Sequence, residues 1–130
     1  MVQPNKAIVT TRSSGRAMII EVTGEVGPGV PSAKDLADQA AQKKTRIAIL
    51  DLSLAETIDS EGLRWLEQVS STLEPAGVRV RVVSKEGSKV GKILRLMKFD
   101  RFLLVLGTVL DALRFGRRKR LAGPPKGPTA

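Results

Sequence analysis

The sequence predicts an α/β fold with a mainly parallel central sheet of about five strands and a cover of helices. Short apolar runs of strand length alternate with amphipathic segments of helical period along most of the chain. Strands that alternate with helices favour parallel pairing through right-handed crossover connections. A chain of 130 residues has room for one domain. We therefore expect the order β-β-α-β-α-β-α-β-α in a single domain, residues 1–115.

The chain is expected to open with a β-hairpin and a loop. Residues 7–10 and 17–22 are apolar runs of strand length, and residues 13–15 (Ser-Ser-Gly) between them favour a turn. Residues 24–31 contain three glycines and two prolines, a composition that is typical of a loop. The first two strands are therefore expected to pair with each other.

The first helix, the third strand and the second helix follow in order. Ser32 is typical of a helix N-cap, with Asp35 as an acidic partner three residues later. Residues 46–51 are an apolar run that suits a central strand, and a short polar connection joins them to a helix after Ser60. Residues 75–77 (Pro-Ala-Gly) end that helix. The two helices would each bury one apolar face: Leu36, Ala37, Ala40 and Ala41 on the first, and Leu63, Leu66, Val69 and Leu73 on the second.

A strand, a helix, a short strand and a last helix complete the domain. Residues 78–83 alternate apolar and basic side chains, which is typical of a strand with one face in solvent. Residues 103–105 would form the fifth strand, and Thr108 could cap a final helix that reaches about Phe115. A third helix over residues 88–97 would bury four apolar side chains: Val90, Ile93, Leu94 and Met97.

The composition excludes most classes of enzyme. The sequence contains no cysteine, histidine or tyrosine, so thiolate catalysis, a Ser-His-Asp triad and zinc–sulfur sites are excluded. The N-terminus lacks the apolar core of a signal peptide, and the longest apolar run, residues 102–106, is far shorter than the roughly 20 residues of a membrane span. We therefore expect a cytoplasmic protein without catalytic activity, cofactor or metal.

The basic charge is concentrated at the C-terminus. The formal net charge is +9, yet six of the 22 basic residues and none of the 13 acidic residues lie from Arg114 onward. Residues 116–130 are rich in glycine, proline and like charge, which predicts a disordered basic tail. The predicted strands lack aromatic side chains on which bases could stack, so we expect no RNA-binding module.

The most informative segment connects the central strand to the second helix. It places Asp59 and Ser60 at the start of that helix, among unpaired backbone N–H groups and the positive end of the helix dipole. A phosphate on the Ser60 hydroxyl would be tolerated there and would strongly change the charge that a partner meets. The local alternative is that Ser60 or Asp59 merely caps the helix. These residues indicate a switch more than a catalyst.

Several pieces of sequence occur together with this order of elements. They are Leu50-Asp51-Leu52-Ser53, Ile58-Asp59-Ser60-Glu61-Gly62-Leu63, Gly24 after the second strand, Ala76-Gly77 before residues 78–83, and the closing segment from Leu103 to Leu113. As a set, from about residue 7 to residue 113, they resemble a STAS domain of the kind found in bacterial anti-sigma-factor antagonists. The resemblance implies a STAS fold.

The resemblance also implies a partner-switching function. In that family the serine that matches Ser60 is phosphorylated by a partner that is both anti-sigma factor and serine kinase, and a metal-dependent serine phosphatase resets it. The unmodified protein binds the partner and frees the sigma factor, whereas the phosphorylated protein is released. The resemblance therefore implies that Ser60 is the phosphoacceptor, and the residues expected to bind the partner are Glu25, Asp59, Ser60, Glu61, Gly62 and Arg64.

Two alternative functions stay open at this point. STAS domains that are never phosphorylated act as adaptors in signalling scaffolds and lipid-transport complexes, and STAS domains occur as monomers or homodimers. Basic side chains of the third helix, such as Lys89 and Lys92, could dock with the tail on an anionic membrane or on nucleic acid. The lack of aromatic side chains on the predicted strands makes nucleic acid the less favoured of these two partners.

Two further features of the segment have more than one interpretation. Four carboxylates in it (Asp51, Glu56, Asp59 and Glu61) could hold Mg²⁺, although nothing in their spacing requires a metal. Trp65 lies near the edge of the buried helix face and is either a core residue or an anchor at an interface. The expected helix packing favours the core position for Trp65.

Overall fold

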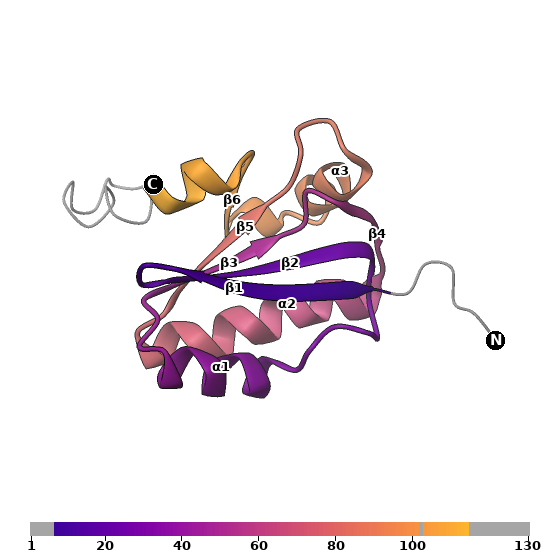
Figure 1. Cartoon of the computed structure of the whole chain (residues 1–130). Coiled ribbons are helices and arrows are strands. Elements are labelled where there is room, and N and C mark those ends of the chain that lie inside the picture. The colour runs from indigo at the N-terminus through magenta and orange to yellow at the C-terminus, as the bar shows by residue number, and fades with distance from the viewer. Residues whose placement is uncertain (1–6, 102, 115–130) are drawn as a thin grey trace.

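The computed structural model describes residues 7–101 and 103–114, and the predicted tail at residues 116–130 lies outside them. Its sheet has the strand order β1-β2-β3-β5-β6, with β4 paired to the end of β2 (Figure 1). β1 is antiparallel to β2, and the other strand pairs among the described residues are parallel. The elements are β1 (Ile8–Ser14), β2 (Ala17–Val26), α1 (Ala33–Gln42), β3 (Ile47–Asp51), β4 (Ala55–Ile58), α2 (Ser60–Leu73), η1 (Glu74–Ala76), β5 (Arg79–Val83), α3 (Lys89–Leu96), η2 (Phe99–Arg101) and β6 (Leu104–Leu106).

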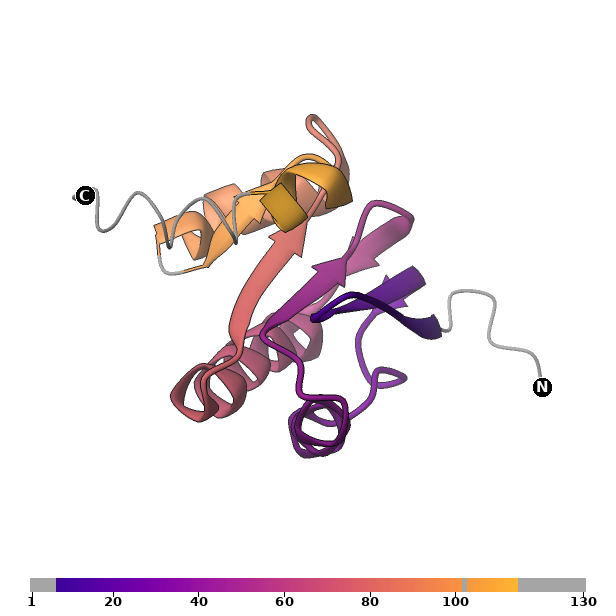
Figure 2. The same ribbon diagram turned by 60° about the vertical axis from the view of Figure 1, so that its left-hand side comes forward.

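The two faces of the sheet are covered by different helices. α1 and α2 lie side by side against one face, and the helical residues 109–114 lie on the opposite side (Figure 2). Alternate residues of β3 therefore enter two cores, with Leu50 in the core that contains α1 and α2 and Ile49 in the core that contains Ala112. All five residues of β3 are buried as a result. The predicted α/β fold is confirmed.

Polar side chains begin the helices. The Ser32 hydroxyl accepts a hydrogen bond from the Asp35 backbone N–H at 3.1 Å at the start of α1. The Thr108 hydroxyl accepts one from the Asp111 N–H at 3.1 Å at the start of the helical residues 109–114. Each such bond satisfies an N–H that the helix leaves unpaired and is worth about 1 kcal/mol. Both predicted caps are confirmed.

The prediction of a short polar connection between β3 and α2 is wrong in one respect. That connection contains an additional strand, β4, so the sheet has six strands and not five. Glu25 and Val26 at the end of β2 pair with Thr57 and Ile58, after a shift in register beyond Gly24. β2 is thus longer than predicted, and the loop that follows it begins only after Val26. The backbone groups at the end of β2 need a partner, which β4 supplies.

The prediction that one face of the strand at residues 78–83 is exposed to solvent is also wrong. β5 lies between β3 and β6, and Arg81 in its centre is only 4% exposed. Its guanidinium Nη1 donates to the Val80 carbonyl at 2.9 Å, while Nε has no partner among the described residues. Burial lowers the pKa of Arg81, although the carboxylate of Glu74 opposes that shift. The alternation of apolar and basic residues in β5 therefore does not indicate a solvent-exposed face.

Two residues predicted for the helix faces lie outside the core. Met97 is 56% exposed because α3 ends at Leu96 and the backbone of Met97 leaves the helical conformation. The next residue, Lys98, has a left-handed backbone with φ of 63° and turns the chain away. Ala41 is exposed near the end of α1. The other predicted helix residues are buried or half-buried.

Candidate functional site

The segment from β3 to α2 is held by hydrogen bonds of its own side chains. Asp51 ends β3 and is buried, and its Oδ1 accepts the backbone N–H of Ser53 at 3.0 Å and the Ser53 hydroxyl at 2.7 Å. These bonds turn the chain out of β3, and β4 then runs parallel to the end of β2. The segment therefore reaches the start of α2 in a defined conformation.

Asp59, and not Ser60, is the N-cap of α2. Its backbone is extended, and its Oδ1 accepts the Gly62 backbone N–H at 2.9 Å. Ser60 is the first residue of the helix and is exposed. Its hydroxyl forms no hydrogen bond with any residue that the structure describes. The Ser60 hydroxyl is thus presented to solvent and is not needed to start the helix.

Close packing around two glycines fixes the position of the helix start. A Cβ on Gly62 would collide with the Val26 carbonyl oxygen and lie 2.7 Å from Cγ1 of Ile58. A Cβ on Gly27 would lie 2.9 Å from Oδ2 of Asp59, and the Asp59 N–H donates to the Val26 carbonyl at 3.2 Å. The loop after β2 therefore lies directly against the residues that carry Ser60.

The other predicted partner-binding residues lie around this start. Glu61 and Arg64 are exposed on α2, and Glu25 is half-buried at the end of β2, opposite Thr57 in the strand pairing. Arg64 follows Ser60 by four residues, so the two side chains lie on the same face of α2. The structure brings Glu25 to the same end of the sheet as Asp59 and Gly62.

Trp65 belongs to the core and links α2 to the loop that follows β2. Its ring is buried, and its indole Nε1–H donates to the Pro31 carbonyl at 2.6 Å. This bond joins the loop after β2 to α2 one turn beyond Ser60. The core position of Trp65 is therefore confirmed.

One exposed apolar residue at the beginning of β4 escaped sequence reasoning. Leu54 precedes β4 and is 52% exposed, and its carbonyl accepts the Gly24 N–H at 3.4 Å. Its near neighbours Leu52 and Ala55 are also apolar, so no local contrast in the sequence distinguishes it.

The four carboxylates of the segment do not form a metal site. Within residues 7–101 and 103–114, no group of three acidic, histidine or cysteine side chains is placed to hold a metal ion. The Asp51 and Asp59 carboxylates are instead hydrogen-bonded to backbone N–H groups.

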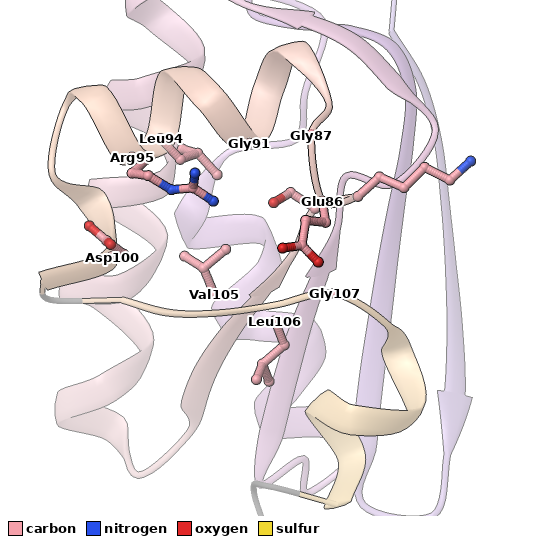
Figure 3. A pocket seen from close by; sticks show the side chains of 11 residues that line it. Glu86, Gly87, Gly91, Leu94, Arg95, Asp100, Val105, Leu106 and Gly107 are labelled. Atoms are coloured by element: carbon pink, nitrogen blue, oxygen red, sulfur yellow. The ribbon is translucent and has the colours of Figure 1, made fainter.

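A small polar pocket of about 230 Å³ lies at the ends of β5 and β6 (Figure 3). Arg95 from α3 and Glu86 from the preceding loop lie on opposite sides of it, and Val105 lies between them (Figure 3). Lys85 and Asp100 also line the pocket, so its charges are balanced. Its lining therefore favours no anion or cation.

The helices of the described residues include none that is long and apolar enough to cross a membrane. Each helix found here belongs instead to the packed layers around the sheet.

Comparisons with known proteins agree with the fold. The family model described as "STAS domain" matches residues 9–112. The fold is similar to the crystal structure of an anti-sigma factor antagonist from Mycobacterium paratuberculosis, with a TM-score of 0.74 and 19% identity over 90% of this chain and 99% of that one. It is also similar to the anti-sigma factor antagonist SpoIIAA in its unphosphorylated form, with a TM-score of 0.62 and 14% identity over 92% of this chain and 100% of that one. No curated protein sequence matches the chain.

Proposed function

Given that the chain belongs to the STAS domain family, we propose that it is an anti-sigma-factor antagonist that acts by partner switching in the cytoplasm. The observation that carries this proposal is the exposed Ser60 hydroxyl, which has no hydrogen-bond partner among the described residues. Two solved structures with the same fold are described as anti-sigma factor antagonists. In this proposal the unmodified protein binds an anti-sigma factor that is also a serine kinase, and phosphorylation of Ser60 releases it.

The position of Ser60 suits a reversible phosphate. A phosphate at the first residue of α2 lies at the positive end of the helix dipole, and Arg64 one turn later carries a complementary charge. Asp59 keeps its cap to Gly62 without help from Ser60. Phosphorylation would therefore leave the domain folded, and its effect would fall on the partner.

The released state follows from electrostatics at the contact surface. A phosphate adds nearly two negative charges where the partner fits a neutral hydroxyl. Desolvating such a charge without a matching cation costs several kcal/mol, and each 1.4 kcal/mol is a tenfold change in affinity. The exposed carboxylate of Glu61 next to Ser60 adds further negative charge to this surface. In this proposal the partner contacts Ser60 together with Glu25, Asp59, Glu61, Gly62 and Arg64, of which Ser60, Glu61 and Arg64 are exposed.

The decisive experiment compares two variants of Ser60. The probe is an anti-sigma factor of the serine-kinase type with a non-hydrolysable ATP analogue, so that Ser60 stays unmodified, and binding is measured by calorimetry. Ser60→Ala is expected to bind like the unmodified protein, and Ser60→Asp is expected to lose at least tenfold in affinity. Ser71→Asp, a substitution at an exposed position of the same helix, is the control and should bind normally.

A second experiment tests the modification itself. Intact-mass spectrometry and peptide mapping of the protein from its native cells should find one phosphate on Ser60. Conversion of that form to the unmodified mass by a metal-dependent serine phosphatase would complete the cycle. Equal binding by Ser60→Ala and Ser60→Asp, with Ser60 unmodified in cells, would refute the switch.

A constitutive STAS adaptor is the second candidate, and the position of Glu61 favours it. This exposed carboxylate is next to the acceptor hydroxyl and would repel the phosphates of ATP. An adaptor would bind its partner regardless of the residue at position 60. The Ser60→Asp measurement separates the two functions.

A further inference from the structure

A second pocket lies at the end of the sheet opposite Ser60. It has a volume of about 460 Å³ and lies where β2 and β3 begin, beside the turn between β1 and β2. In Figure 1 that turn and the end of the C-terminal helical segment lie on the left, whereas β4, which leads to Ser60, lies on the right. The pocket is lined by Gly15, Arg16, Ala17, Arg46, Ile47 and Leu113, together with Ser14.

Two arginines stand next to each other in this pocket. The carbonyl of Arg16 accepts the backbone N–H of Arg46 at 2.8 Å and that of Ile47 at 3.3 Å, so the two arginines are neighbours immediately before β2 and β3. Like charges held close together repel each other. Neither guanidinium forms an ion pair with a described residue, and both residues are exposed.

The surroundings add positive charge and no compensating acid. None of the residues that line the pocket is acidic. Lys43 and Lys44 lie in the connection that leads from α1 to Arg46. The chain continues from Leu113 into Arg114 and a basic segment of sequence. The charge therefore selects an anionic occupant.

Three further lining residues are apolar, beside Ser14 and Gly15. They are Ala17, Ile47 and Leu113, and Ala17 and Ile47 belong to the core on this face of the sheet. Small-molecule sites are typically concave, mostly apolar, and oriented by a few polar groups. A guanidinium binds a carboxylate through two parallel hydrogen bonds, which a pair of arginines can do from two sides.

We propose that this pocket binds a small organic anion, namely a carboxylate carried on an apolar chain. The two arginines hold the carboxylate, and the chain covers Ala17, Ile47 and Leu113. This inference is independent of the switch at Ser60, because it concerns the opposite end of the sheet.

The experiment titrates the full-length ¹⁵N-labelled protein with octanoate and follows the amide signals by NMR. Saturable shifts are expected at Gly15, Arg16, Ile47 and Leu113. The double variant Arg16→Gln/Arg46→Gln should lose at least tenfold in octanoate affinity. Arg12→Gln, which removes an exposed arginine of β1 that does not line the pocket, should bind like the unchanged protein.

Three further probes can overturn the proposal. Inorganic phosphate and octanol each carry half of the required chemistry, so both should bind at least tenfold more weakly than octanoate. Binding to an oligonucleotide or to phosphatidylglycerol vesicles without binding of octanoate would assign the arginines to a polyanion or a membrane instead. Octanoate binding that survives in the double variant would also refute the proposal.

Discussion

At the scale of single residues, Gly62 at the start of α2 packs too closely on Val26 and Ile58 to leave room for a side chain. Gly62→Ala is expected to lower the free energy of unfolding by about 1–3 kcal/mol, because a methyl group there meets the Val26 carbonyl and Ile58. Urea unfolding measures the change. Gln68→Ala, at an exposed position of the same helix, should change the free energy by less than about 0.5 kcal/mol. Equal stability of Gly62→Ala and the unchanged protein would contradict the close packing.

The roles of Asp59 and Ser60 show how far the sequence alone predicts the start of α2. Both residue types cap helices, so local preference could not decide between them. The decision depends on the contact of Asp59 with Gly27 and Val26, which are more than thirty residues away along the chain. The sequence could therefore predict that one of the two caps α2, and only the tertiary contacts leave Ser60 unbonded.

At the scale of elements, β5 holds a charged side chain where a central strand normally has an apolar one. Arg81→Met is expected to leave the free energy of unfolding unchanged or to raise it by about 1 kcal/mol, because an apolar chain of similar length removes a buried charge with an unpaired Nε. Arg81→Lys is expected to lower it, since an ammonium is more strongly hydrated than a guanidinium. Thermal and urea unfolding measure both changes, and a large loss in Arg81→Met would reveal a role for the guanidinium.

α3 differs from the other two α-helices in the charge of its first turn. α1 and α2 have an acidic residue there, whereas α3 has none and begins with Lys89. Lys89→Glu/Lys92→Glu is expected to stabilise the helix by about 0.5 kcal/mol through the dipole. If the exposed basic face of α3 docks an acidic partner, the same variant should bind the anti-sigma factor more weakly and with less dependence on salt. Unchanged affinity and unchanged salt dependence would show that these lysines take no part in binding.

The elements that sequence predicted well are those whose signals are local. The strand at β3 and the three α-helices follow from apolar runs, helical period and capping residues in adjacent sequence. β4 and the burial of β5 were missed because each depends on a distant segment. β4 forms against the end of β2, and Arg81 lies on the same face of the sheet as Val83, which packs with residues 109–114.

At the scale of the whole molecule, the composition of residues 116–130 predicts a basic tail outside the domain. Deleting residues 116–130 is therefore expected to leave the melting temperature within about 2 °C of the full chain. The deletion removes five of the basic residues, so the protein should elute from heparin at lower salt. Differential scanning calorimetry and heparin chromatography measure the two effects. A large fall in melting temperature would show that the domain extends beyond residue 115.

The sequence contains a single tryptophan, and its indole is bonded to the loop beside Ser60. Its fluorescence therefore comes from one place, five residues after the proposed phosphoacceptor. Any event that separates the loop after β2 from α2 would expose the indole to water and shift its fluorescence emission to longer wavelength. The unlabelled protein thus carries an optical reporter of its own, with which partner docking can be timed in a stopped-flow instrument.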